Sequence, residues 1–176
     1  MRRVAILGRG GAGKTALARE LSALTGIPAI ELDSVFWQRG PLPTSTEQWV
    51  ARQRELVAGD SWILDGDLGP YDSGLGARLA AADTIILLDF GLIRCVWRTL
   101  RRGQREEPEY WSWVLFYRRW HLPQLDAAIA PQLPRAEVYV LRNPAAVRSF
   151  LAEVQDALAH HGLSGTTGTA GTAGTV

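Results

Sequence analysis

The chain has 176 residues, of which 47% are hydrophobic and 21% are charged, so it contains enough apolar material for one buried core. Its 19 basic and 18 acidic residues leave a formal net charge of +1, which argues against a strongly basic nucleic-acid-binding protein. The single cysteine excludes an intramolecular disulfide, and no segment has the length and hydrophobicity of a signal peptide or a membrane span. We therefore expect one cytoplasmic domain that does not enter a membrane and does not bind DNA.

In chain order, short apolar runs alternate with stretches that have helical periodicity. The runs predicted to be buried strands are residues 3–7, 27–32, 61–65, 84–89 and 136–141. The predicted helices are residues 15–24, 46–58 with Ser45 as cap, 91–102, and a last helix that begins with Asn143 as cap and Pro144 in its first turn. This alternation predicts βαβ units and a parallel sheet, which is the α/β fold class.

Two segments differ from this pattern. Residues 164–176 repeat Gly, Thr and Ala and offer nothing to bury, so we predict a disordered tail behind one domain of residues 1–163. Residues 103–131 are predicted to be rich in helix and to form a lid. Aromatic residues recur there at helical spacing: Trp113, Phe116, Tyr117 and Trp120. Such a stripe is typical of a core or of a lid that packs onto the body; the alternative is a pocket that stacks a base.

The stretch between the first strand and the first helix matches G-x-x-x-x-G-K-[ST], the Walker A motif or P-loop. Its residues are Gly8, Arg9, Gly10, Gly11, Ala12, Gly13, Lys14 and Thr15. Glycines here let backbone N–H groups surround phosphate oxygens, and the helix directs its positive end to the same point. Lys14 is expected to reach the β- and γ-phosphates of a nucleotide, and Thr15 to ligate magnesium. Lys14 is also the one lysine of the chain, as expected if this position requires an ammonium group.

The same glycines also contain G-x-G-x-x-G, a pattern typical of dinucleotide-binding folds. Asp33 lies about 20 residues beyond its last glycine, near where such folds place a ribose-binding acid. This alternative leaves Lys14 and Thr15 without a role, and G-x-G-x-x-G alone is a permissive pattern. The P-loop is therefore the favoured interpretation.

Two aspartates follow predicted strands and are expected at the carboxyl edge of the sheet, where α/β proteins bind their ligands. Asp65 ends the third strand, and a carboxylate at this point can help to bind the magnesium ion of a nucleotide. The alternative is that Asp65 only caps the segment that follows. Asp33 follows the second strand. It has the chemistry to orient or deprotonate an acceptor hydroxyl, to hold a substrate, or only to cap its own turn.

Arginines gather after the fourth strand, largely on one side of the predicted helix: Arg94, Arg98, Arg101, Arg102 and Arg105. Guanidinium groups stabilise the negative charge that spreads over a phosphoryl group during its transfer. For individual members of this group, a solvated basic face is the alternative.

Four segments together resemble the small bacterial P-loop proteins known as DNA topology modulation protein or adenylate kinase-related kinase. They are the P-loop, Leu32-Asp33-x-x-Phe36-Trp37, Trp62-Ile63-Leu64-Asp65-Gly66 and Ala82-Asp83-Thr84-Ile85-Ile86-Leu87-Leu88-Asp89. The resemblance covers residues 1–155. It implies the three-layer α/β/α fold of nucleoside monophosphate kinases, a P-loop NTPase fold with a five-stranded parallel sheet in the order 2-3-1-4-5.

More distantly, Leu64-Asp65-Gly66 and the region from Asp89 to Arg102 resemble adenylate kinase. By that resemblance Asp65 helps to hold magnesium, and Arg98 and Arg102 contact the transferring phosphates. The same resemblance puts Arg142 beside the adenine.

These observations predict an ATP-dependent phosphotransferase, a kinase that moves the γ-phosphate to a small acceptor, with nucleotides among the candidates. No Asn-Lys-x-Asp occurs, so ATP rather than GTP is the expected donor, with Mg²⁺ as cofactor. The expected catalytic residues are Lys14, Asp33, Arg98 and Arg102. The alternatives are a nucleotide-binding regulatory protein linked to DNA topology and a kinase of a small hydroxylated metabolite. The sequence leaves the acceptor and the oligomeric state open.

Overall fold

A computed structural model of the protein describes residues 1–37, 44–102 and 108–164. Its centre is a parallel sheet with the strand order β2-β3-β1-β4-β5, the order that the resemblance implies. The strands are β1 (Arg3–Gly8), β2 (Ala29–Glu31), β3 (Trp62–Asp65), β4 (Thr84–Leu88) and β5 (Glu137–Leu141). The register pairs Ile6 of β1 with Asp65 of β3 and with Ile86 of β4. The carboxyl ends of these strands therefore lie at one edge of the sheet.

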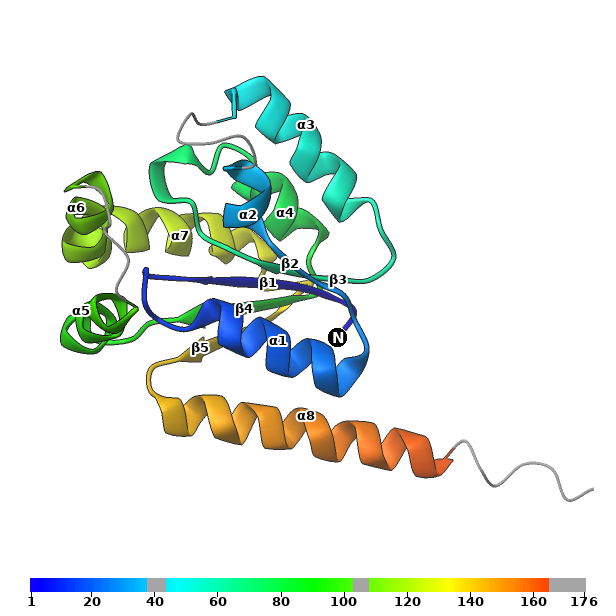
Figure 1. Cartoon of the computed structure of the whole chain (residues 1–176). Helices are drawn as coiled ribbons and strands as arrows, with labels where there is room; N and C mark the ends of the chain where they lie inside the picture. The colour runs from blue at the N-terminus through cyan, green and yellow to red at the C-terminus, as the bar shows by residue number, and fades with distance from the viewer. Residues whose placement is uncertain (38–43, 103–107, 165–176) are drawn as a thin grey trace, which may run out of the picture.

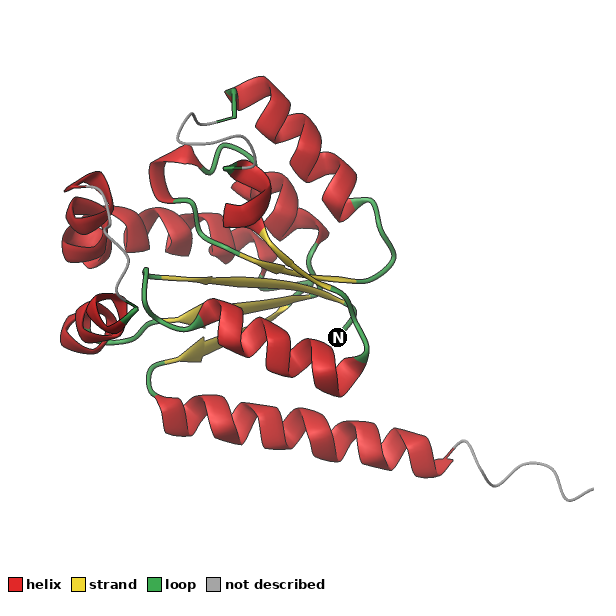
Figure 2. Cartoon of the chain, viewed as in Figure 1, coloured by secondary structure: helices red, strands yellow, loops and turns green. Residues whose placement is uncertain are grey.

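Helices cover both faces of this sheet, so the molecule has three layers (Figures 1 and 2). One face carries α1 (Lys14–Thr25) and α8 (Pro144–Ser164). The opposite side carries α2 (Leu32–Phe36), α3 (Thr46–Val57), α4 (Leu75–Ala81) and α7 (Leu122–Ile129). Beyond the carboxyl ends of the strands lie α5 (Leu92–Arg101) and α6 (Pro108–Phe116), and α6 continues into the π-helix η2 (Tyr117–His121). Over the described residues, no helix combines the length and hydrophobicity needed to cross a lipid bilayer.

Alternate residues of the strands face opposite helical layers. In β1, Val4 and Ile6 pack in a cluster with residues of α1 and α8, such as Leu21. Ala5 and Leu7 point the other way and pack in a second cluster with residues of α3, α4 and α7. Full burial of a Leu or Ile side chain contributes about 1.5–3 kcal/mol, so the two clusters fix which helices cover each face.

The predicted helix starts agree with the structure. The Ser45 hydroxyl accepts a hydrogen bond from the Gln48 amide at 3.3 Å, and α3 begins at the next residue. The Asn143 carboxamide oxygen accepts one from the Ala146 amide at 2.9 Å, directly before α8. The sequence patterns do not predict the short helices α2 and α4, and β2 is shorter than predicted because α2 begins directly after it. Of the predicted disordered tail, residues 164–176, Ser164 is the last residue of α8, and residues 165–176 lie outside the described residues.

The aromatic stripe predicted in the lid segment is divided between two sides. Trp113 and Tyr117 pack inward, with ring centroids 5.8 Å apart, and Tyr117 is buried. Phe116 and Trp120 instead stack on each other at the surface, with centroids 4.5 Å apart. Only the Trp113–Tyr117 edge of the stripe therefore packs onto the body of the protein.

A buried ion pair fixes the loop that follows β3. Arg78 of α4 donates from Nη2 to Asp72 Oδ2 at 2.6 Å, and both side chains are almost fully buried. The same guanidinium donates to Gln53 Oε1 at 2.6 Å and to the Gly66 carbonyl at 3.2 Å. Buried charges persist when such additional hydrogen bonds accompany the pair. The network therefore holds the backbone directly after Asp65 in place.

Candidate functional site

The P-loop lies at the carboxyl edge of the sheet, between the end of β1 and the start of α1 (Figure 1). Its residues before Lys14 are all buried. Gly11 and Gly13 have φ angles of 77° and 102°, in the left-handed region that favours glycine. A Cβ at Gly13 would lie 2.9 Å from Arg98 Nη1, and one at Gly11 would collide with the Cys95 carbonyl. These glycines therefore allow α5 to approach the loop backbone closely.

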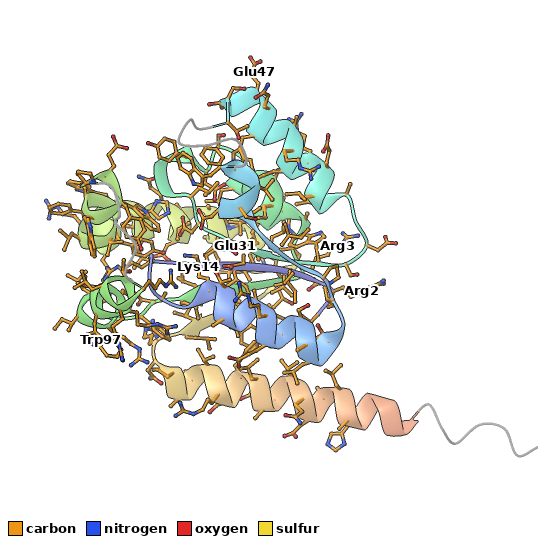
Figure 3. All side chains as sticks on the ribbon, viewed as in Figure 1. Arg2, Arg3, Lys14, Glu31, Glu47 and Trp97 are labelled. Atoms are coloured by element: carbon orange, nitrogen blue, oxygen red, sulfur yellow. The ribbon has the colours of Figure 1, made fainter. Side chains whose placement is uncertain are left out.

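Lys14 begins α1, and its ammonium group turns back to the loop (Figure 3). Nζ donates hydrogen bonds to the carbonyl oxygens of Gly8 at 2.8 Å and Arg9 at 3.4 Å. It also lies 5.9 Å from the centre of the Trp113 ring of α6. Phosphate oxygens are stronger acceptors than these carbonyls because they are charged, so the ammonium is positioned to exchange one for the other.

Asp65, the last residue of β3, is 2% exposed, and neither of its carboxylate oxygens accepts a hydrogen bond from any described residue. Burial raises the pKa of this carboxyl, and the nearby Lys14 ammonium and Thr15 hydroxyl only partly offset the effect. Asp65 and Thr15 line a cavity of about 380 Å³, which Glu31 at the end of β2 also lines. Figure 3 shows Lys14 and Glu31 at this end of the sheet.

These two side chains fit Mg²⁺. Mg²⁺ in nucleotide sites is bound through one or two protein oxygens, and water and phosphate oxygens complete its coordination. The buried carboxylate of Asp65 accepts no well-formed hydrogen bond from a described residue, and the Thr15 hydroxyl lies beside it. Among the described residues, no group of three or more His, Cys, Asp or Glu side chains forms a metal site.

Asp33 lies in the first turn of α2, directly after β2. The residue is solvent-accessible, but the protein atoms around its carboxyl raise the pKa of that group, and Lys14 acts in the opposite direction. A carboxylate that solvent can reach is able to accept the proton of an acceptor hydroxyl. Because its carboxyl interacts with the charge of Lys14, Asp33 lies near the P-loop at the carboxyl edge of the sheet.

The arginines of α5 point in different directions. Arg98 faces the P-loop at Gly13, as described above, whereas Arg101 lies 4.6 Å from the ring centre of the exposed Trp97, on the outer side of the helix (Figure 3). Arg102 is exposed at the C-terminal end of α5. Arg105 lies outside the described residues. Arg94 lies 5.8 Å from the ring centre of Phe90, so among the described arginines of this cluster it is Arg98 that faces the loop. The catalytic role of Arg102 stays a prediction.

Arg142 directly follows β5, and its side chain is 70% exposed. Its Nε lies 3.8 Å from Asp89 Oδ2, and Asp89 Oδ1 accepts a hydrogen bond from Arg118 Nη2 at 2.9 Å. These contacts join the ends of β4 and β5 to η2 at the carboxyl edge of the sheet. The position of Arg142 beside an adenine ring stays a prediction.

Sequence reasoning missed a buried cluster between β3 and η2. Asp67 accepts hydrogen bonds from His121 Nε2 at 2.6 Å and from Tyr117 Oη at 3.3 Å. Arg9 of the P-loop is 2% exposed, lies 5.2 Å from the centre of the Tyr117 ring, and has Nε and Nη1 without a partner among the described residues. Desolvation lowers the pKa of Arg9. No local pattern predicts this cluster, because its members lie far apart in the sequence.

The fold is that of P-loop kinases. Shikimate kinase from Acinetobacter baumannii in complex with shikimate has a TM-score of 0.60 and 16% identity, over 93% of this chain and 96% of that chain. A gluconokinase from Sinorhizobium meliloti 1021 has a TM-score of 0.51 and 14% identity, over 94% of this chain and 97% of that chain. Deoxyadenosine kinase from M. mycoides, with dCMP and dCDP bound, has a TM-score of 0.51 and 13% identity, over 89% of this chain and 98% of that chain.

The sequence matches no protein-family model and no curated protein sequence. At the identities of the structural neighbours, the similarity shows the fold alone. The P-loop NTPase kinase fold is therefore established, whereas the resemblance to the DNA topology modulation family stays a prediction.

Proposed function

We propose that the protein is a kinase that uses ATP and Mg²⁺ to phosphorylate a small acceptor. The observation that carries this proposal is the buried Asp65 carboxylate, which accepts no well-formed hydrogen bond although the Thr15 hydroxyl and the Lys14 ammonium lie near it. Burial of an unpartnered carboxylate is costly, and a cation bound with a nucleotide would remove that cost. The neighbouring structures, all of them kinases, support the same conclusion.

In this proposal the P-loop amides and Lys14 bind the β- and γ-phosphates, and Arg98 stabilises the charge of the transferring group. Thr15 and Asp65 hold Mg²⁺, which neutralises phosphate charge when it is bound. Arg102 also contacts the transferring group, and Arg142 lies beside the adenine. The segment 103–131, of which residues 103–107 lie outside the described residues, excludes water from the transfer step as a lid.

The chemistry of Asp33 favours an acceptor hydroxyl over an acceptor phosphate. A hydroxyl must lose a proton when it attacks phosphorus, whereas a phosphate oxygen is already ionised at neutral pH. A carboxylate at the position of Asp33, directly after β2, is a suitable base for the former and has no such role in the latter. The named neighbours include a kinase of a small non-nucleotide compound, shikimate, and a kinase of a nucleoside, deoxyadenosine.

A screen for ADP release tests this proposal. The full chain is incubated with MgATP and with panels of hydroxylated metabolites, nucleosides and nucleoside monophosphates. We expect at least one hydroxyl compound to raise ADP release above the rate of ATP hydrolysis, and Asp33→Asn to abolish this increase while ATP binding is retained. Stimulation by nucleoside monophosphates alone, unaffected by Asp33→Asn, would contradict the role assigned to Asp33. ATP binding without any transfer would favour a regulatory protein.

A further inference from the structure

Asp67 joins the end of β3 to the helical segment that covers the P-loop. Its side chain is 0% exposed, and that of His121 is 10% exposed. Asp67 Oδ1 accepts hydrogen bonds from His121 Nε2 at 2.6 Å and from the Gly69 amide at 3.2 Å, and Oδ2 accepts one from Tyr117 Oη at 3.3 Å. The carboxylate thus uses both oxygens and holds two residues of η2 at once.

The ionisation state of this carboxylate sets the direction of the hydrogen bonds. The Gly69 amide and the Tyr117 hydroxyl both donate to Asp67, as they do to an ionised carboxylate. An ionised carboxylate only accepts hydrogen bonds, so His121 Nε2 and Tyr117 Oη are donors. Charge-assisted hydrogen bonds of this kind are about twice as strong as neutral ones.

The segment held by Asp67 also contacts the phosphate loop. The Tyr117 ring faces the guanidinium of Arg9, and Trp113, one turn earlier, lies against both Gly10 and Gly69. A Cβ at Gly10 would be 3.0 Å from the Trp113 ring, and one at Gly69 would be 2.7 Å from Trp113 Nε1. Trp113 also faces Lys14 Nζ, as described above. η2 is a π-helix, a rare form that occurs often at functional sites.

We propose that Asp67 is a positioning residue for phosphoryl transfer: through His121 and Tyr117 it holds Trp113 against the P-loop, so that the acceptor rather than water receives the phosphoryl group. This inference rests on the proposed function. In the transfer, the bond from the γ-phosphorus to the bridging oxygen breaks and leaves with its electrons on ADP. The acceptor oxygen forms the new bond to phosphorus, and its proton passes to Asp33.

The test compares Asp67→Asn with the wild type. The amide has nearly the size of the carboxylate, but it brings an NH₂ group against a donor and loses the charge. We expect kcat for transfer to fall roughly tenfold or more, since small misplacements at a reacting centre cost up to about 10²-fold. The KM for ATP should change little, and the share of ATP that is hydrolysed rather than transferred should rise. Hydrolysis with MgATP alone supplies the reference rate.

Two further variants separate positioning from folding. His121→Gln keeps an N–H donor within reach of Asp67 and should retain part of the transfer rate, whereas His121→Leu should lose it as Asp67→Asn does. Tyr117→Phe removes one hydroxyl and keeps the packed ring; it should shift the ratio of hydrolysis to transfer in the same direction by a smaller amount. This variant carries the test if Asp67→Asn fails to fold.

Asp83→Asn is the matched control. Asp83 accepts hydrogen bonds from the Arg2 and Arg3 amides, at the opposite end of the strands from the P-loop. Its replacement should lower the melting temperature and leave kcat and the ratio of hydrolysis to transfer unchanged. Equal kinetic losses in Asp83→Asn and Asp67→Asn, or wild-type kinetics in Asp67→Asn, would overturn the role of Asp67 and would leave the proposed function unaffected. If the wild-type chain transfers phosphate to no acceptor, the proposed function fails first, and this inference fails with it.

Discussion

Replacement of Lys14 by arginine is expected to lower kcat for phosphoryl transfer by roughly 10²-fold or more, although the charge is kept. The ammonium lies between the Gly8 carbonyl, at 2.8 Å, and the Trp113 ring. A guanidinium is planar, wider and fixed in its fork, so it does not fit this space in the same geometry. It would displace the γ-phosphate from the line of attack or lie outside the loop, and either position removes stabilisation of the transition state.

Arg148→Lys is the matched control, because it makes the reverse exchange at an exposed position of α8, away from the P-loop. Steady-state kinetics and thermal melts are measured on both variants. We expect both melting temperatures to stay near that of the wild type, since neither side chain belongs to the core clusters. Turnover by Lys14→Arg at a rate near that of the wild type would show that the one lysine of the chain has no special role.

Asp65→Asn is expected to stabilise the free protein and to impair its activity. The substitution removes a buried charge that has no hydrogen-bond partner among the described residues. The amide still has polar atoms there but no charge, and relief of a buried charge without a hydrogen bond contributes about 1 kcal/mol or more, which corresponds to a rise in melting temperature of roughly 2–4 °C. The apparent affinity for Mg²⁺ in the presence of ATP, or the activity, should fall roughly 10- to 100-fold, as for other groups that orient a metal.

The stabilisation should depend on pH, with a sign set by the pKa of Asp65. The folded protein raises this pKa above its ordinary value of 3.8. Below about pH 3.8, Asp65 is protonated in both the folded and the unfolded state, and the charge has no effect on folding. As pH rises from there through the raised pKa, the unfolded state ionises more readily, so the wild type loses stability relative to Asp65→Asn.

Urea unfolding from pH 4 to pH 8 measures this difference, and Asp60→Asn, on the exposed turn before β3, is the control. The difference between Asp65→Asn and the wild type should grow with pH and then stay constant, while Asp60→Asn should follow the wild type. A loss of stability in Asp65→Asn at neutral pH would contradict the absence of a partner for this carboxylate.

Local signals in the sequence predicted the parts of the fold that depend on neighbouring residues. The P-loop follows from one continuous motif, and its glycines are needed where the structure shows left-handed φ angles and close contact with α5. The helix starts after Ser45 and Asn143 follow from capping side chains that bond to amides three residues away. The central strands β1, β3 and β4 follow from apolar runs that are buried on both faces, whereas the edge strands β2 and β5 are partly exposed. The sheet order came from the family resemblance.

The remaining features depend on contacts between distant parts of the chain. Helix α4 is short, and its Arg78 is held by Asp72 and Gln53, so no periodic pattern marks it. Asp67 and His121 are 54 residues apart, and each is unremarkable in its own segment. The directions of the α5 arginines also could not be predicted, because helical spacing does not say which edge of the helix meets the P-loop.

Calorimetric titration of the full chain with ATP, in the presence and absence of Mg²⁺ and with GTP and NAD in parallel, tests the central claim most directly. That claim is that the loop of residues 8–15 holds the phosphates of ATP together with a magnesium ion. We predict that ATP binds more tightly with Mg²⁺ than without it, and that it binds more tightly than GTP or NAD. Binding of NAD without binding of ATP would contradict the account and favour the dinucleotide interpretation of the same glycines.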